Sequence, residues 1–319
     1  MPRNGKESAE RCRYGIGEWY GSLFYNLSHS QRREYAQAAL GRKANVPCPF
    51  RQGTALCNKA GGVCSLRMYQ LAPDTNNVSV ATGDAGRLAA TCPCRFEENG
   101  LVFGWVGERI LGHAQPVVVG EVGFLEREVR NEEQGSGVSG FDDVGRIDNI
   151  LVHPDHEPLL WCALEIQAVY FSGKAMSNEF RAILDHKGTD MPFPAEHRRP
   201  DYRSSGPKRL MPQLQIKVPT LRRWGKKMAV VVDESFFSAL GQMDTVDHVS
   251  NADIAWFVVR FQEEGGRARL APADLHLTTL ERAVEGLTAG HAVDLDTFEG
   301  RIREKLTRAA SRPPSQGCD

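Results

Sequence analysis

Apolar, β-prone runs separated by polar connections dominate the second half of the chain and predict a strand-rich core. The expected strands cover 116–125 (buried), 147–152, 161–171, 228–232 and 254–261, with shorter ones at 268–272 and 276–277 after a Gly265-Gly266 turn. Helical patterns occur at 14–40, where Ser28 to Ser30 supply a cap, and at 102–111, 278–288 and 294–310. Residues 131–140 form a flexible turn, and a long connection follows Phe171 to about Leu210. We expect an α/β fold, a mixed central sheet flanked by helices.

One predicted strand carries two polar side chains on a single face. Side chains alternate along a strand, so Glu165 and Gln167 share a face within an otherwise apolar run. Asp148 heads the preceding run, and the turn-forming segment 153–158 predicts a hairpin with both acids on one rim. Two such carboxylates can hold a divalent cation, although the same pattern also occurs on merely solvated strands. The apolar neighbours of Glu165 favour a partnered, nuclease-like site.

Composition indicates a soluble globular protein with a large core. The chain has 319 residues, 41% of them hydrophobic and 25% charged. The N-terminal segment lacks the apolar core of a signal peptide, and no run approaches a membrane span, so we expect a cytoplasmic protein without membrane contact. We expect an N-terminal helical and cysteine-rich region at 1–100, a second domain at 101–310 and a disordered tail at 311–319.

The net charge of −1 hides a basic window at 196–227. It holds ten Lys or Arg against two acids: Arg198, Arg199, Arg203, Lys208, Arg209, Lys217, Arg222, Arg223, Lys226 and Lys227. Such a window could hold a polyanion through phosphate contacts, or it could be a solvated helix face.

Five of the eight cysteines gather at Cys48, Cys57, Cys64, Cys92 and Cys94. In a reducing compartment such a cluster favours a metal over disulfides, and four thiolates suit zinc or a single iron. The best ligands are Cys48, Cys57, Cys64 and either Cys92 or Cys94. The spacing is not that of common zinc fingers, so buried cysteines without metal remain an alternative.

Three stretches together resemble the NotI-type restriction endonucleases. The matching residues are Leu164-Glu165-Ile-Gln167 with Phe171-x-Gly173 and Asp148; Cys48-Pro-Phe, Cys57, Gly62-Val-Cys64 and Cys92-Pro-x-Arg95; and, more weakly, the basic segment before Met228 with Leu270-Ala-Pro272.

The resemblance implies a PD-(D/E)xK nuclease core with an N-terminal four-cysteine metal-binding subdomain. In it Asp148 and Glu165 bind a catalytic Mg²⁺, and Gln167 stands where most of that superfamily carries lysine. Cys48, Cys57, Cys64 and Cys92 hold a structural iron or zinc; Cys92 matches better than Cys94. Lys174 is a candidate for the missing charge, and Glu121 or Glu126 for an additional acid.

The implied activity is that of a type II restriction endonuclease acting on double-stranded DNA. A homodimer cuts a G·C-rich palindrome and leaves 5′-phosphate and 3′-hydroxyl ends. Guanine is read best by arginine, and the candidates are Arg198, Arg199, Arg203, Arg209, Arg222 and Arg223.

Three alternatives stay open at this point. A repair or recombination nuclease would cut by DNA structure, and a non-catalytic thiolate-metal protein would bind DNA without cutting it. A redox protein with an iron-thiolate centre is favoured by the cysteines alone.

Overall fold

The computed structural model describes residues 11–41, 46–51, 53, 55–72, 77–130, 138–288 and 293–310. Its larger sheet has six strands in the described chain, in the order β15-β14-β13-β10-β9-β6. Their bounds are β6 Val117–Val119, β9 Asn149–Val152, β10 Trp161–Ile166, β13 Met228–Asp233, β14 Ile254–Glu264 and β15 Arg267–Thr278. β13 runs parallel to both β10 and β14, whereas the outer pairs are antiparallel. The expected mixed α/β architecture is therefore present.

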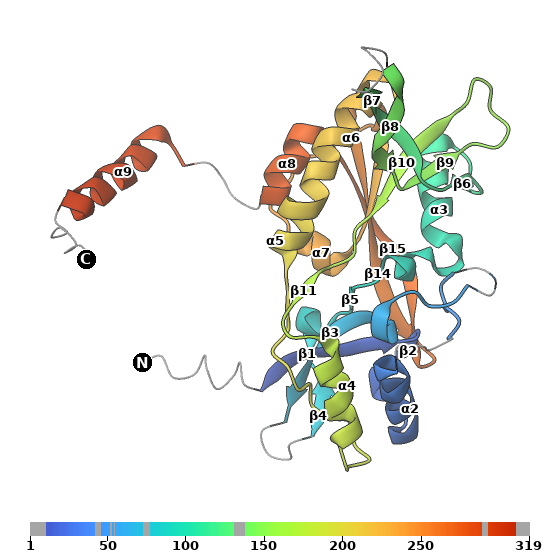
Figure 1. The fold of residues 1–319 in the computed structure, drawn as a ribbon, viewed down its shortest axis with the longest axis vertical. Helices are drawn as coiled ribbons and strands as arrows, with labels where there is room; N and C mark the ends of the chain where they lie inside the picture. Colours follow the sequence, from blue (N-terminus) through green and yellow to red (C-terminus); the bar gives the residue numbers. More distant parts are fainter. Residues whose placement is uncertain are drawn as a thin grey trace.

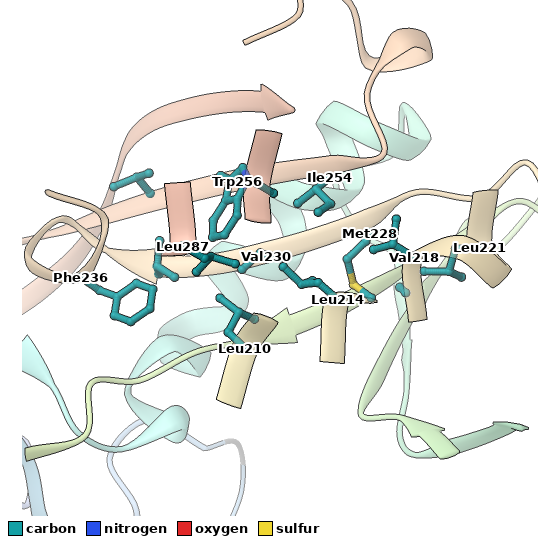
Figure 2. Close-up of a cluster of buried hydrophobic side chains, with 14 of the residues drawn as sticks. Leu210, Leu214, Val218, Leu221, Met228, Val230, Phe236, Ile254, Trp256 and Leu287 are labelled. Carbon is teal, nitrogen blue, oxygen red and sulfur yellow. The ribbon is translucent and has the colours of Figure 1, made fainter. Parts of the chain in front are cut away.

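Side chains of the central strands alternate between two apolar cores, one on each face of this sheet. Met228 and Val230 pack on one face, under α6 (Met211–Arg223) and α8 (Leu280–Thr288). Figure 2 shows Leu210, Leu214, Val218 and Leu221 lining this core against Val230 and Trp256. Ala229 and Val231 face the other core, which is covered by α3 (Leu101–Val106) and the π-turn Gly107–Leu111. Figure 1 shows α6 and α8 on one side of the sheet and α3 on the other.

A second sheet forms the N-terminal part of the molecule (Figure 1). β1 (Cys12–Trp19), β2 (Ser22–Leu23), β3 (Val63–Leu71) and β4 (Val78–Val80) follow the order β2-β1-β3-β4, with β5 (Ala89–Ala90) paired to β3. An aromatic core lies between this sheet and the helices α2 (His29–Leu40) and α4 (Met176–Asp185), where Trp19 stacks on Phe180 at 5.3 Å. Residues from the chain's middle thus complete the N-terminal layer.

The predicted helix at 14–40 is wrong in its first half. The aromatic stretch forms β1, β2 and the 3₁₀ turn Phe24–Asn26 instead. Gly15 and Gly17 explain this, because glycine disfavours helix and both positions sit against neighbours: an added Cβ would lie 2.5 Å from Pro194 and from Leu88, respectively. The second half is confirmed: Ser28 caps α2 in a capping box with Gln31.

Other predicted boundaries change in the structure. The run 116–125 divides into β6 and β7 (Val122–Arg130), and its valines are exposed rather than buried. β7 pairs with β8 (Val138–Ile147), so 138–140 belong to a strand, while 131–137 and the predicted tail 311–319 lie outside the described residues. The two short runs after Gly266 are one strand, β15.

The long connection after Phe171 also contains regular structure. It holds β11 (Phe171–Ser172) paired with β12 (Arg199–Pro200), α4 and α5 (Tyr202–Ser205), and a π-turn at Gly206–Leu210 leads into α6. Short helix α7 (Glu234–Ser238) follows β13, and α9 (Leu295–Ala310) closes the described chain. No helix in the described ranges is long and apolar enough to cross a membrane.

Candidate active site

The predicted hairpin brings the two acids together. β9 and β10 pair antiparallel with Asn149 opposite Leu164, so Asp148 and Glu165 are the next residues at the same end of the ladder. Glu165 is buried and points to the face covered by α6, since Ala163 belongs to that core and Leu164 to the opposite one. Asp148 lies in the bend between β8 and β9 with its side chain 56% exposed. One carboxylate is thus enclosed and the other reaches solvent.

Lys217 of α6 contacts both carboxylates. Its Nζ donates to Glu165 Oε2 at 2.8 Å and to Gln213 Oε1 at 2.7 Å, and it lies 3.8 Å from Asp148 Oδ1. The sequence analysis counted Lys217 as one basic residue among ten and missed this position. A usable signal was present: Lys217 falls on the apolar stripe of Leu214, Val218 and Leu221, and a lysine buried on such a stripe needs an acidic partner.

Opposing effects act on the buried Glu165 carboxyl group. Burial raises its pKa above the usual range for a glutamate, the Lys217 ammonium opposes that rise, and the charge of Asp148 adds to it. The carboxylate therefore depends on a positive charge beside it, whether from lysine or from a bound cation.

Gln167 and the other residues expected to assist catalysis do not contact the two carboxylates through any interaction in the described structure. The backbone N–H of Gln167 continues the ladder to Val231 O at 3.0 Å, while its side chain turns back to donate to Ala168 O at 2.6 Å. Lys174 is exposed and lies 3.6 Å from Glu196. Glu121 pairs with Arg146 at 3.0 Å, and Glu126 is exposed on β7 opposite Asp143. The lysine that the structure places at the carboxylates is therefore Lys217, not Lys174.

The six candidate arginines differ in their surroundings. Arg198 is buried, and its guanidinium donates to the carbonyls of Lys174 and Ala175, which is a structural arrangement. Arg222 forms ion pairs with Asp253 and Glu281. The other four arginines are exposed, as Arg222 is, and three of them lie in the helical run 202–223 that carries Lys217: Arg203, Arg209 and Arg223; the fourth is Arg199.

Four of the five clustered cysteines pack together with Phe50, and Cys92 is joined to them through Cys64: the four are Cys48, Cys57, Cys64 and Cys94. Cys48 and Cys57 lie on a narrow loop closed by the bonds Cys48 N to Ala55 O and Cys57 N to Val46 O, each 2.8 Å long. Cys64 is the second residue of β3, and Cys92 N donates to Cys64 O at 3.2 Å. Cys48, Cys64 and Cys92 are buried, whereas Cys57 and Cys94 are half-buried.

Cys92 and Cys94 differ in the hydrogen bonds that their sulfur atoms make. The Cys92 sulfur accepts hydrogen bonds from the Cys94 thiol and from the backbone N–H groups of Cys94 and Arg95, which lower its pKa to about 6 against the opposing effect of burial. The same thiol bond raises the pKa of Cys94. Such N–H···S bonds favour a thiolate at Cys92. The donor set suits zinc or iron, yet across the described ranges no three His, Cys, Asp or Glu side chains are arranged to share a metal.

A buried ion pair joins the cysteine segment to both sheets. Arg95 Nε lies 2.9 Å from Glu18 Oε2 of β1, and both side chains are fully buried. The same guanidinium pairs with Glu98 at 2.8 Å and donates to Ala268 O of β15 at 2.8 Å. It also lies over the rings of Phe50 and Phe261. The Arg95 guanidinium is therefore satisfied by protein groups and serves a structural role.

The fold and this site define an α/β protein whose paired carboxylates suit cation-assisted chemistry. A family model described as restriction endonuclease NotI matches residues 32–271, more than half of the chain. The chain belongs to the NotI restriction endonuclease family, as its motifs indicated. Membership implies a site-specific DNA hydrolase, and thus a protein that binds DNA. A comparison with curated proteins gave no match.

Proposed function

We propose that this protein is a type II restriction endonuclease that cleaves double-stranded DNA with Mg²⁺ held by Asp148 and Glu165. The observation that carries the proposal is that both carboxylates already surround one positive charge, the Lys217 ammonium, at the end of the β9–β10 hairpin. Carboxylate oxygens of this kind are the ligands that Mg²⁺ takes from proteins, and it completes its shell with water and phosphate. The PD-(D/E)xK assignment of the sheet rests on the same pair.

A Mg²⁺ ion held there would neutralise charge on the scissile phosphate and make a bound water more acidic. The protein's own part is positional. Glu165 is fixed by its strand and by burial, whereas the exposed Asp148 faces the side from which DNA can approach. Hydrolysis then joins a water oxygen to phosphorus and breaks the bond to the 3′-oxygen, which leaves 5′-phosphate and 3′-hydroxyl ends.

DNA binding falls to the exposed arginines near α6. Arg203 lies on α5 and Arg209 on the π-turn that leads into α6, in the same helical run as Lys217, so both can contact phosphates or guanines close to the cut. Cutting both strands of a G·C-rich palindrome requires two copies of the site, and a symmetric homodimer supplies them.

The thiolate cluster would hold one structural iron or zinc through Cys48, Cys57, Cys64 and Cys92. The loop hydrogen bonds hold Cys48 and Cys57 near each other, and the N–H···S bonds to Cys92 support Cys92 over Cys94 as the fourth ligand. The metal would stabilise an irregular segment that buries little apolar surface of its own.

Cleavage of unmethylated, G·C-rich phage DNA tests the activity. Wild-type protein should give discrete fragments with Mg²⁺ and none with EDTA, and Asp148→Ala and Glu165→Ala should each abolish cutting. Lys187→Ala, which removes an exposed charge after α4, is the matched control and should cut normally. Cleavage that requires DNA ends or branched junctions, instead of a particular sequence, would favour a structure-dependent nuclease. Tight DNA binding by a folded, metal-replete protein that never cuts would favour a non-catalytic one.

Elemental analysis of the purified protein tests the thiolate site. We expect about one iron or zinc per chain, reduced strongly in Cys92→Ser and retained in Cys94→Ser. Retention of the metal in Cys92→Ser with loss in Cys94→Ser would assign Cys94 as the ligand. Metal-free wild-type protein with a sharp unfolding transition would instead show that the cysteines are ordinary core residues.

A further inference from the structure

Lys217 occupies a position that ordinary packing does not explain. It lies among Leu214, Val218 and Leu221 on the buried stripe of α6, and its side chain is only 6% exposed. An isolated ammonium there would be costly, and a leucine would fill the core without that cost. The helix nevertheless places a charge there, and the ammonium donates a hydrogen bond to Gln213, one turn earlier in the same helix.

The three N–H groups of this ammonium are unequally used. Two of them donate to Glu165 and Gln213, at 2.8 and 2.7 Å. The remaining polar neighbour in the described structure is Asp148 Oδ1 at 3.8 Å, which is beyond hydrogen-bond length. One donor is thus left on the side of the exposed carboxylate, where water and a phosphate would enter.

We propose that Lys217 is a catalytic residue of the cleavage reaction and supplies, from α6, the positive charge that position 167 lacks. This inference rests on the proposed function. The spare N–H would donate to the attacking water or to a phosphate oxygen while Glu165 and Gln213 hold the ammonium in place. Gln167 cannot take this part in the present arrangement, because its amide is bonded to Ala168 O.

The reaction balances without any change in the lysine. A water oxygen forms its bond to phosphorus as the bond from phosphorus to the 3′-oxygen breaks. The water gives up one proton to solvent, and the leaving oxygen takes one up. Lys217 remains an ammonium and stabilises the extra negative charge that gathers on the phosphate.

A purely structural lysine would only neutralise Glu165, so the test must separate charge from packing. Moving the charge does this: Gln167 directly follows β10 and its backbone N–H continues the ladder to Val231 O, so a lysine at position 167 is two residues from Glu165 and can approach the same carboxylates from the end of that strand. We would compare Lys217→Met, Lys217→Gln and the double variant Gln167→Lys/Lys217→Met with wild type and with the Lys187→Ala control. The readouts are the single-turnover cleavage rate at saturating Mg²⁺, DNA affinity in Ca²⁺ without Mg²⁺, and thermal unfolding.

The expected result is a rate at least about 100-fold lower in Lys217→Met and Lys217→Gln, with DNA affinity unchanged. The double variant should recover about tenfold or more of that loss. Lys217→Gln keeps a hydrogen-bond donor beside Glu165 and decides the matter if Lys217→Met does not fold.

Two results would overturn the inference: a folded, neutral variant that cuts as fast as Lys187→Ala, or a folded double variant no faster than the neutral single variants. Absence of cutting by wild-type protein would instead remove the proposed function, and the two failures are therefore distinguishable.

Discussion

Two buried ion pairs in this molecule use the same kinds of group for different ends. Arg95 and Glu18 are enclosed on all sides. The Arg95 guanidinium donates to Glu18, to Glu98 and to a backbone carbonyl. Lys217 and Glu165 are also buried, at 6% and 5% exposure, but their third partner, Asp148, is exposed to solvent and one N–H of Lys217 has no acceptor within hydrogen-bond length in the described structure. The first arrangement joins two sheets and has no place for a ligand. A buried charge alone therefore does not indicate a functional site. A buried charge that keeps one hydrogen-bond donor free on its solvent side is the better indication.

The largest effect should come from breaking the enclosed pair. Arg95→Met leaves Glu18 as an uncompensated charge with no route to water, and we expect a loss of about 3–5 kcal/mol in the free energy of unfolding. Urea unfolding would measure it. Glu18→Gln/Arg95→Met should recover much of the loss, since no buried charge remains. A loss below about 1 kcal/mol for Arg95→Met would show that the pair contributes little.

The open pair should instead respond to Mg²⁺. Lys217→Met removes a competing positive charge, and a divalent and a monovalent cation about 5 Å apart repel by roughly 1.7 kcal/mol even in bulk water. Mg²⁺ should therefore bind the variant about tenfold more tightly than wild type and raise its melting temperature more. Isothermal titration and thermal unfolding would show this, with Glu165→Gln as the control that removes the effect. Equal or weaker binding by Lys217→Met would contradict it.

An intermediate case is the partly buried pair of Arg67 and Glu263. Burial alone would raise the pKa of Glu263, but hydrogen bonds from Arg67 and Tyr25 outweigh it and lower that pKa. A carboxyl group whose pKa is lower in the folded state than in the unfolded state stabilises the fold at pH values above its unfolded-state pKa. This contribution is lost as the pH falls through the folded-state pKa. Glu263→Gln should thus be less stable than wild type at pH 7, with a gap that narrows below about pH 4. Thermal unfolding between pH 3 and 7 tests this; a pH-independent gap would argue against it.

The smallest effect is expected at the ion pairs that the exposed Arg222 makes with Asp253 and Glu281. Arg222 is 48% exposed, so Arg222→Ala should cost at most about 1 kcal/mol, and high salt should reduce even that. If the same variant also loses DNA affinity, Arg222 exchanges its acidic partners for phosphate on binding.

Periodicity along single strands was enough to predict the β9–β10 hairpin and the carboxylate pair. Both acids follow from local signals: an apolar run, a turn and the alternation of side chains. Lys217 could not be placed in the same way, because it lies 52 residues after Glu165 and its meeting with that residue depends on how α6 packs over the sheet. Only its position within an apolar stripe pointed to a buried partner.

Elements that depend on distant neighbours were predicted least well. The glycines of β1 lie in a strand against which Pro194 and Leu88 pack. These two residues are far away in the sequence, so the local pattern around the glycines did not predict the strand. α4 is short and lies in a segment that the Gly and Pro content presented as loop, yet it fills the N-terminal aromatic core. The predicted domain boundary near residue 100 remains a prediction.

The pairing of Asn149 with Leu164 has a consequence for which length changes this chain can tolerate. An insertion of one residue within β10 before Leu164 would turn Glu165 to the opposite face and Leu164 toward α6, so the core and the site would both be disrupted. The connection 153–160 lies outside the pairing between Val152 and Trp161 and can change length without that reversal. Natural length variation in this hairpin should therefore collect in the turn, while the strand from Trp161 to Glu165 keeps a constant number of residues.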